Sequence, residues 1–376
     1  MDHRPPAKPN ILFLFSDTGG GHRSAADAII EALNLEFPGQ FTTEMIDFFK
    51  EYMPPPMNRF PEMYPPLSRM PRVWGLGYHL SNGNRRARLI FQMVYPYVHR
   101  GLSRLVQEHP ANLIVSVHQL VNVPMSRLLA NSPTPFITVV TDMVTTHTSW
   151  YSSRANPIIV PTEDAFQRGR QCGIPAERMR VIGLPVAERF HHPTADRDTL
   201  RIRLGWEMGL PVVMLVGGGE GMGPLYRTAL SIEEANLPVV LVVVCGRNRR
   251  LRARLEARPW QIPVFIYGFV REMPDFMRAS DVLVTKAGPG TLCEAFISGL
   301  PMILYSRMPG QEDGNVTFVV RKGAGVWAPK PEEVTQALKN WLLHPEERYR
   351  AANISKSLAH PLAARQIARI LAEKVR

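Results

Sequence analysis

Cysteine is scarce in this sequence. The 376 residues include three cysteines, at positions 172, 245 and 293, and no two of them form a CxxC pair. Scattered cysteines in odd number argue against a disulfide framework and against a cysteine zinc site. We therefore expect a protein of a reducing, cytoplasmic compartment.

Long apolar runs are also missing. The longest are Ile11–Phe15 and Val239–Cys245, far below the ~18 apolar residues of a membrane-spanning helix. The first ten residues, MDHRPPAKPN, and the five apolar residues after them lack the h-region of a signal peptide. We expect neither a spanning helix nor a secretory leader.

Acidic residues are fewer than basic ones. Lys and Arg total 44 against 33 Asp and Glu, a net charge of +11. Such an excess of positive charge favours an anionic partner. The candidates are a nucleic acid, an anionic membrane and a phosphorylated substrate. No nucleic-acid motif is recognisable, and that partner would leave the glycine-rich segments described below unexplained. We therefore expect that the protein has no nucleic-acid partner.

The shortage of acids is most pronounced between Lys50 and Arg104. This segment has nine Lys and Arg, two acids and eight aromatic residues. Basic and aromatic side chains together favour contact with an anionic membrane surface, although an ordinary insertion with a solvated basic face remains the alternative. The expected contact residues are Trp74, Arg85, Arg86 and Arg88.

Short apolar runs alternate with helical patterns along the chain. Strands are expected at Ile11–Phe15, Leu113–Val117, Phe136–Val140, Pro157–Val160, Met179–Ile182, Val212–Val216, Val239–Val244, Val264–Tyr267, Val282–Thr285 and Met302–Leu304. This alternation predicts an α/β protein with two Rossmann-like domains, whose parallel sheets bind ligands at the carboxyl ends of their strands. The expected division is 1–190, a junction at 191–206, 207–345, and a helical segment at 346–376.

The first glycine-rich segment, SDTGGGHRSAADAII, runs from Ser16 to Ile30. It leads from an expected strand through Gly19, Gly20 and Gly21 into a helix over Arg23–Phe37. Glycine allows a ligand to approach the main chain, and the positive end of the helix keeps His22 neutral and able to accept a proton. The alternative is a histidine that only packs against or caps the helix.

Two further glycine-rich turns follow strands. GGGEGMG covers Gly217–Gly223 and TKAGPGTLCEAF covers Thr285–Phe296. Neither continues as a P-loop, but both present backbone N–H groups to an anion. Lys286 and Thr291 add donors, and Glu294 can accept ribose hydroxyl groups, unless it only complements a helix start. The combination indicates a nucleotide.

Polar residues follow two other strands. In PGQEDGNV, Gln311, Glu312 and Asn315 suit a polyhydroxylated ligand such as a sugar, although polar loops are usually only solvated. Asp142, His147 and Trp150 follow the strand at Phe136–Val140. We expect them to bind an acceptor or orient His22, because with His118 they match no recognised metal-ligand spacing.

Together these motifs resemble the monogalactosyldiacylglycerol synthase and processive diacylglycerol glucosyltransferase family. The resemblance covers roughly Ile11 to Trp327 and includes DTGGGHRSAADAI, TDMVTTHTSWY, GGGEGMG, CGRN, GFV, TKAGPGTLCEA and PGQEDGNV, in the family's order. It implies a GT-B glycosyltransferase with a central cleft, which uses a UDP-sugar as substrate without a metal or other cofactor and inverts the anomeric carbon.

The resemblance also implies roles for single residues. His22 is the expected base, and Asp142, His147 and Trp150 are expected on the acceptor side. The expected UDP-sugar residues are Gly20, Gly21, Gly217, Gly218, Gly219, Glu220, Gly221, Arg247, Asn248, Phe269, Val270, Lys286, Gly288, Pro289, Gly290, Thr291, Glu294, Gln311, Glu312 and Asn315.

The resemblance therefore predicts an enzyme that moves galactose or glucose from a UDP-sugar to 1,2-diacylglycerol, peripherally bound at the cytoplasmic face of a membrane. The acceptor domain is expected at 1–190 and the UDP-sugar domain at 207–345. The alternatives are an N-acetylglucosamine transferase with a polyprenyl-linked acceptor, a UDP-sugar epimerase and a catalytically silent sensor. The sequence leaves the sugar and the oligomeric state open.

Overall fold

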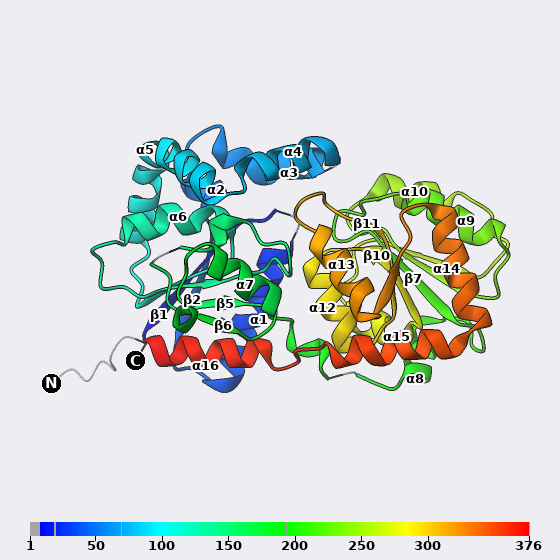
Figure 1. Ribbon diagram of the computed structural model, residues 1–376. Coiled ribbons are helices and arrows are strands. Elements are labelled where there is room, and N and C mark those ends of the chain that lie inside the picture. Colours follow the sequence, from blue (N-terminus) through cyan, green and yellow to red (C-terminus); the bar gives the residue numbers. More distant parts are fainter. Residues whose placement is uncertain (1–7, 19, 69, 153, 193, 376) are drawn as a thin grey trace. The chain divides into compact units, whose positions relative to one another are not determined.

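The computed structural model describes residues 8–18, 20–68, 70–152, 154–192 and 194–375. The chain divides into two compact units (Figure 1). One consists of the chain up to Glu188 together with Leu362–Arg376, and the other is Arg189–Pro361.

The first unit is built on a parallel sheet of six strands in the order β2-β1-β3-β4-β5-β6. The strands are β1 (Asn10–Phe15), β2 (Thr42–Asp47), β3 (Leu113–Ser116), β4 (Phe136–Val139), β5 (Ile158–Val160) and β6 (Met179–Val181). Alternate residues of β1 enter different cores. Leu12 and Leu14 pack on one face, and Ile11 and Phe13 pack on the other. The central strands are therefore buried on both faces, as parallel strands usually are.

Helices cover both faces of this sheet. The helices of the first unit are α1 (Gly21–Glu36), α2 (Phe48–Tyr52), α3 (Phe60–Ser68), α4 (Pro71–Ser81), α5 (Asn84–Glu108), α6 (Gln119–Leu128), α7 (Glu163–Gln171) and α16 (Ala363–Val375), with short 3₁₀ turns η1 (Met57–Arg59), η2 (Thr148–Trp150) and η3 (Ala176–Arg178). A fourth turn, η4 (Glu188–Phe190), contains the residue at which the chain passes into the second unit. Residues of α1 and α16 share one core, and residues of α2, α5 and α6 share the other.

The second unit repeats this plan with the strand order β12-β11-β10-β7-β8-β9, again all parallel. Its strands are β7 (Val212–Val216), β8 (Val240–Val244), β9 (Val264–Tyr267), β10 (Val282–Lys286), β11 (Met302–Ser306) and β12 (Gly325–Trp327). Its helices are α8 (Arg197–Leu204), α9 (Leu225–Glu234), α10 (Arg249–Glu256), α11 (Met273–Ala279), α12 (Pro289–Ser298), α13 (Asp313–Lys322), α14 (Pro331–Leu343) and α15 (Pro345–Ser357).

The predicted α/β class with two parallel sheets is confirmed, and each of the ten expected strands overlaps an observed one. The sequence missed β2 and β12, which lie at sheet edges. β2 reads TTEMID and β12 has three residues. Edge strands carry polar residues and are short, so they lack the apolar run that identifies a central strand.

The C-terminal segment differs from the expectation. Residues 346–376 do not form one segment, because most of α15 lies there in the second unit, whereas α16 returns to the first. Figure 1 shows α16, in red, beside α1. Ile367 and Leu371 are buried in the α1 core, and Arg369 Nε donates to Glu36 Oε2 at 2.7 Å. The expected junction at 191–206 also contains α8.

The helical segment that follows β2 is joined to the first unit where α5 crosses α2. A Cβ added at Gly101 would overlap the carbonyl oxygen of Tyr52, so only glycine allows this approach of the two backbones. The Tyr52 hydroxyl donates to Glu108 Oε2 at 2.8 Å, near the end of α5. This crossing anchors the base of the α3–α5 segment.

We therefore expect Gly101→Ala to destabilise the first unit, because overpacking costs about 1–3 kcal/mol. Gly77→Ala, on α4, is the matched control. A Cβ at Gly77 meets no atom within 4 Å, and alanine gains up to about 1 kcal/mol of helix propensity. Calorimetric midpoints should fall for the first variant and stay level or rise for the second. Equal shifts would contradict the close crossing.

Candidate functional site

The first group of site residues lies at the carboxyl edge of the first sheet. Gly20 has the left-handed φ of 82° and precedes Gly21, the first residue of α1. His22 therefore lies at the helix start, as the sequence predicts, although the helix begins two residues before the expected Arg23. Gly19 lies outside the described residues. The loops after β3 and β4 reach the same edge because all three strands are parallel.

A backbone carbonyl determines the tautomer of His22. Its Nδ1 lies 2.8 Å from the carbonyl oxygen of Val117 and 2.9 Å from Oγ1 of Thr141. A carbonyl oxygen can only accept, so Nδ1 carries the proton and Nε2 has the lone pair. The ring is oriented to take a proton at Nε2, as a general base requires.

The surroundings of His22 keep its ring neutral. Burial lowers its pKa to about 4, and the bond to Val117 only partly opposes this. The ring of His118 is 4.5 Å from that of His22. His118 Nδ1 accepts the Leu120 N–H at 3.3 Å, and burial, followed by the charge of His22, holds the pKa of His118 well below its usual value. Two neutral imidazoles therefore lie side by side.

Asp142 and Trp150 form a buried pair beside His22. Trp150 Nε1 donates to Asp142 Oδ2 at 2.6 Å, and the Trp150 ring lies 6.3 Å from that of His22. Neither side chain is more than 2 % exposed. The expected role of these residues in acceptor binding stays a prediction, and the geometry places them next to the candidate base.

His147 holds two parts of the first unit together. Its Nδ1 accepts the Ser149 N–H at 3.2 Å, and its Nε2 lies 3.2 Å from Ser81 Oγ at the end of α4. Burial is the main cause that lowers its pKa to about 4.

Within the described part of the chain, no three His, Cys, Asp or Glu side chains form a group that could hold a metal ion.

Two loops of the second unit pack backbone against backbone. The amide N–H of Arg247 donates to the carbonyl oxygen of Gly219 at 2.8 Å, and a Cβ at Gly246, where φ is +56°, would overlap that same oxygen. Arg247 also bonds Glu220 at 2.8 Å, and its guanidinium lies 5.0 Å from the ring centre of Phe269. The loops after β7, β8 and β9 thus meet at one edge.

Asn248 and Val270 complete this edge. The Asn248 Oδ1 accepts the Leu251 N–H at 3.0 Å and caps α10, while its Nδ2 donates to the Gly221 carbonyl at 3.4 Å. Val270 is half-buried two residues after Gly268. Asn248 is therefore a structural cap as well as a predicted nucleotide contact.

Lys286 lies between the two glycine-rich turns. A Cβ at Gly288 would be 2.8 Å from Lys286 Nζ, and one at Gly218 would be 3.4 Å from Lys286 Cε. The ammonium pairs with Glu312 Oε1 at 2.6 Å, and Glu312 Oε2 accepts the Met308 N–H at 2.7 Å. Both Glu312 oxygens thus have protein partners, and the predicted sugar contact is at the same time the group that positions Lys286.

The start of α12 leaves backbone donors for a ligand. Gly288 is its N-cap without a side-chain cap, Pro289, Gly290 and Thr291 form the first turn, and that turn contains no acid. Unpaired N–H groups at a helix start bind anions. One turn further, removal from water raises the pKa of Glu294 to about 7, which the charge of Arg189 partly opposes.

The sugar motif surrounds the same turn. Asn315 Nδ2 donates to the Ala287 carbonyl at 2.9 Å and ties α13 to the turn before α12. Gln311 lies half-buried next to Glu312 at the end of the loop after β11. The structure therefore brings the predicted donor residues of the second unit to one sheet edge.

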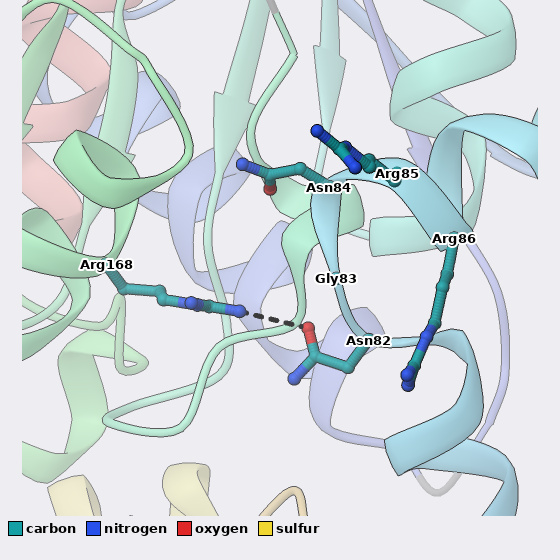
Figure 2. Close-up of a pocket in the computed structure, with 6 residues that line it drawn as sticks. All are labelled: Asn82, Gly83, Asn84, Arg85, Arg86 and Arg168. Carbon is teal, nitrogen blue, oxygen red and sulfur yellow. Dashed lines mark hydrogen bonds between the residues drawn. The ribbon is translucent and has the colours of Figure 1, made fainter.

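The predicted membrane residues lie on α4 and α5. Arg85, Arg86 and Arg88 are exposed. Figure 2 shows Arg85 and Arg86 leaving the first turn of α5 on different sides. Trp74 is half-buried, and its ring is nearly perpendicular to that of Tyr64, with the two ring centres 5.5 Å apart. The sequence did not reveal the more exposed apolar side chains, which lie on outward helix faces: Val73, Leu76 and Leu80 on α4, and Leu89, Met93 and Tyr97 on α5. None of the helices in the described residues is long and apolar enough to cross a bilayer.

Sequence reasoning also missed Val117 and Thr141, the partners of His22. A carbonyl oxygen has no sequence signal, since every residue has one. Thr141 was visible only as the residue before Asp142. Both belong to loops that approach His22 because β1, β3 and β4 are neighbours.

We expect His22→Ala to lower turnover by about 10²–10⁴-fold with UDP affinity nearly unchanged. In the unsubstituted protein the expected base is the neutral His22 ring, whose pKa burial lowers to about 4. At saturating donor, kcat/KM for the acceptor should therefore stay level from pH 7 to 5. For a base histidine of ordinary pKa, kcat/KM would fall about 25-fold over this range, and such a loss would contradict the assignment.

Lys286→Met should weaken UDP binding by about tenfold or more, because a charge-assisted bond to phosphate is worth about 1.5–3 kcal/mol. Lys322→Met on α13 removes the same charge from an exposed position and is the control. Isothermal titration calorimetry with UDP measures both. Equal UDP affinities for the two variants would contradict the assignment of Lys286 to the diphosphate site.

Two family models cover most of the chain. The model described as monogalactosyldiacylglycerol (MGDG) synthase matches residues 22–186, and the glycosyltransferase family 28 C-terminal domain matches 212–367. A probable monogalactosyldiacylglycerol synthase 2, chloroplastic, of Oryza sativa subsp. indica is 37% identical over 370 residues, which cover 95% of this chain and 79% of the rice protein. Monogalactosyldiacylglycerol synthase 2, chloroplastic, of Arabidopsis thaliana is 35% identical over 376 residues, with 97% and 80% covered.

Solved structures show the same architecture. MurG of Acinetobacter baumannii superposes with a TM-score of 0.63 at 14% identity, covering 97% of this chain and 100% of that one. HepE of Anabaena in complex with UDP-glucose has a TM-score of 0.58 at 14% identity, covering 97% and 99%. These likenesses confirm the expected GT-B fold. The chain belongs to the monogalactosyldiacylglycerol synthase family and is a glycosyltransferase.

Proposed function

We propose that this glycosyltransferase moves galactose from UDP-galactose to the free 3-hydroxyl of 1,2-diacylglycerol and forms a β-linked galactolipid. The observation that carries the proposal is the bond from His22 Nδ1 to the Val117 carbonyl, which leaves Nε2 as a base. The names of the relatives from rice and Arabidopsis support galactose as the sugar.

The acceptor step needs a base because an alcohol is a poor nucleophile at neutral pH. His22 Nε2 takes the proton as the hydroxyl oxygen forms its bond to the anomeric carbon, while the bond from that carbon to the diphosphate breaks. Attack opposite the leaving UDP converts the α-linked donor into a β product. Neutrality of the ring above its pKa of about 4 keeps this base available at physiological pH.

The donor step needs stabilisation of the negative charge that develops on the leaving diphosphate. In our proposal this comes from the backbone N–H groups of the turns at Gly217–Gly223 and Gly288–Thr291 and from Lys286, without a metal. Glu312 holds Lys286 between these turns, so the ammonium requires little reorganisation. Glu294, near the start of α12, is proposed to accept the ribose hydroxyl groups.

A diacylglycerol acceptor requires access to a bilayer. The outward faces of α4 and α5 combine apolar side chains, such as Leu76 and Met93, with Arg85 and Arg86. Apolar side chains enter the interface, and each Arg near anionic headgroups adds about 1 kcal/mol. We propose peripheral binding through these helices, at the cytoplasmic face that the unpaired cysteines suggest.

The first test is an assay of the full chain with diacylglycerol in anionic liposomes and labelled UDP-galactose, UDP-glucose or UDP-N-acetylglucosamine, each supplied separately. The expected result is a labelled galactolipid, with a β linkage by NMR, that His22→Ala does not form. Lipid labelled only from UDP-glucose would overturn the choice of galactose as the transferred sugar. Label released only as free sugar would overturn the choice of diacylglycerol as the acceptor.

A further inference from the structure

Tyr305 occupies an irregular position near the carboxyl end of β11. In the pairing with β10, Thr285 lies opposite Leu304 but Lys286 lies opposite Ser306, so Tyr305 is an extra residue with no counterpart in β10. An inserted residue of this kind changes the direction of a side chain, and such bulges are frequent beside functional sites. The irregular register therefore determines where the Tyr305 side chain points.

The Tyr305 side chain reaches past β10 to the strand beyond it. The strand order is β11-β10-β7. The Tyr305 hydroxyl donates to the carbonyl oxygen of Val216, the last residue of β7, at 3.0 Å and to that of Met222, also at 3.0 Å. Val216 immediately precedes the glycine-rich turn Gly217–Gly223, and Met222 lies near the end of that turn. One hydroxyl group therefore joins the two ends of the turn.

Both contacts require that the Tyr305 hydroxyl carries its proton. A carbonyl oxygen only accepts, so the hydroxyl is the donor and shares its proton between the two oxygens. The Tyr305 side chain is buried, with 2 % exposure. Its removal from water raises the pKa of Tyr305 well above its usual value, so the hydroxyl stays protonated and the link between the two ends of the turn persists at physiological pH.

Two further contacts close the turn at the same place. The Met222 N–H donates to the carbonyl oxygen of Gly217 at 2.8 Å. The Tyr305 ring packs beside Gly223, where φ is +94° and an added Cβ would be 2.5 Å from the ring atom Cε2. These contacts involve the two ends of the turn and not the N–H groups of residues 218–220 in its middle. The ends are thus fixed by protein atoms, and the middle of the turn is shaped by them.

We infer that Tyr305 is a positioning residue of the donor site, whose hydroxyl holds the Gly217–Gly223 turn in the conformation that binds the diphosphate of the sugar nucleotide. This inference rests on the donor part of the proposed function and makes it more specific. Without the hydroxyl, the turn adopts the binding conformation for only a fraction of the time, and the apparent affinity for the diphosphate falls in proportion to that fraction.

The second unit offers a matched pair of tyrosines for the test. Y305F removes the hydroxyl that joins the ends of the turn and keeps the ring beside Gly223. Y267F, on β9, removes a hydroxyl that accepts the Trp206 Nε1–H at 3.0 Å and that makes no bond to the glycine-rich turn. Both variants therefore lose a tyrosine hydrogen bond within the same unit, but only Y305F is expected to disturb the diphosphate site.

The experiment is isothermal titration calorimetry of the full chain with UDP, in the absence of acceptor. Y305F should weaken UDP binding about five- to tenfold, the usual effect of one lost hydrogen bond, and Y267F should weaken it less than about twofold. Uridine, which has no phosphate, should bind both variants and the unsubstituted chain equally when it is measured by displacement of UDP. Equal losses of UDP affinity in the two variants, or equal losses of UDP and uridine affinity in Y305F, would overturn the inference.

Kinetics give a second readout of positioning. With UDP-galactose as the varied substrate, Y305F should raise the donor KM by the same factor and keep kcat within about twofold, because a bound donor itself orders the turn. A fall in kcat at unchanged KM would overturn the inference.

The same titrations separate this inference from the proposed function. Unchanged UDP affinity in Y305F, together with weaker UDP binding by Lys286→Met, would refute the role of Tyr305 and keep the proposed donor site. No UDP binding by the unsubstituted chain would refute both. A chain whose UDP binding depends on Tyr305 but which transfers no galactose would refute only the proposed galactosyl transfer.

Discussion

Every pair of neighbouring strands in both sheets is parallel, and the position of each candidate site residue depends on that constraint. Parallel strands all end at the same edge of their sheet. His22 therefore meets Val117 and Thr141, which are 95 and 119 residues away in the chain. The same geometry in the second unit gathers the loops after β7, β8, β9, β10 and β11. One pairing rule thus gathers the residues around the candidate base in one unit and those of the candidate anion site in the other.

Backbone atoms perform much of the positioning within these edges. The Val117 carbonyl decides which nitrogen of His22 carries the proton, and the Gly219 carbonyl accepts from the Arg247 amide. Such contacts need glycine where two main chains approach, as at Gly246 and Gly101, because a Cβ would overlap a carbonyl oxygen. The side chains that carry charge, such as Lys286, are then held by single partners such as Glu312. The candidate proton acceptor and the candidate phosphate site are in this way oriented by contacts within the protein.

The α3–α5 segment, for which we propose the membrane contact, follows different physics. Its helices α3 to α5 contribute little to the sheet core, apart from residues such as Leu102 and Leu105 near the end of α5. Their outward faces keep Leu76, Leu80 and Met93 in solvent, which is unfavourable in water and favourable in a lipid interface. The arginines at the start of α5 show the same mismatch in charge, since they lie at the positive end of a helix. Under the proposed membrane contact, one anionic bilayer relieves both mismatches.

The sequence by itself determined the α/β class, the central strands, the glycine-rich turns and the position of His22 at a helix start, because apolar periodicity and glycine are local signals. It did not reveal the edge strands β2 and β12, whose residues are polar or few, nor the return of α16 to the first unit, which depends on long-range contacts with α1. Only the tertiary structure decided the tautomer of His22, the pairing of Lys286 with Glu312 and the partial burial of Trp74. Each of these depends on an atom supplied by a distant segment, and proximity across a sheet edge leaves no mark in the sequence.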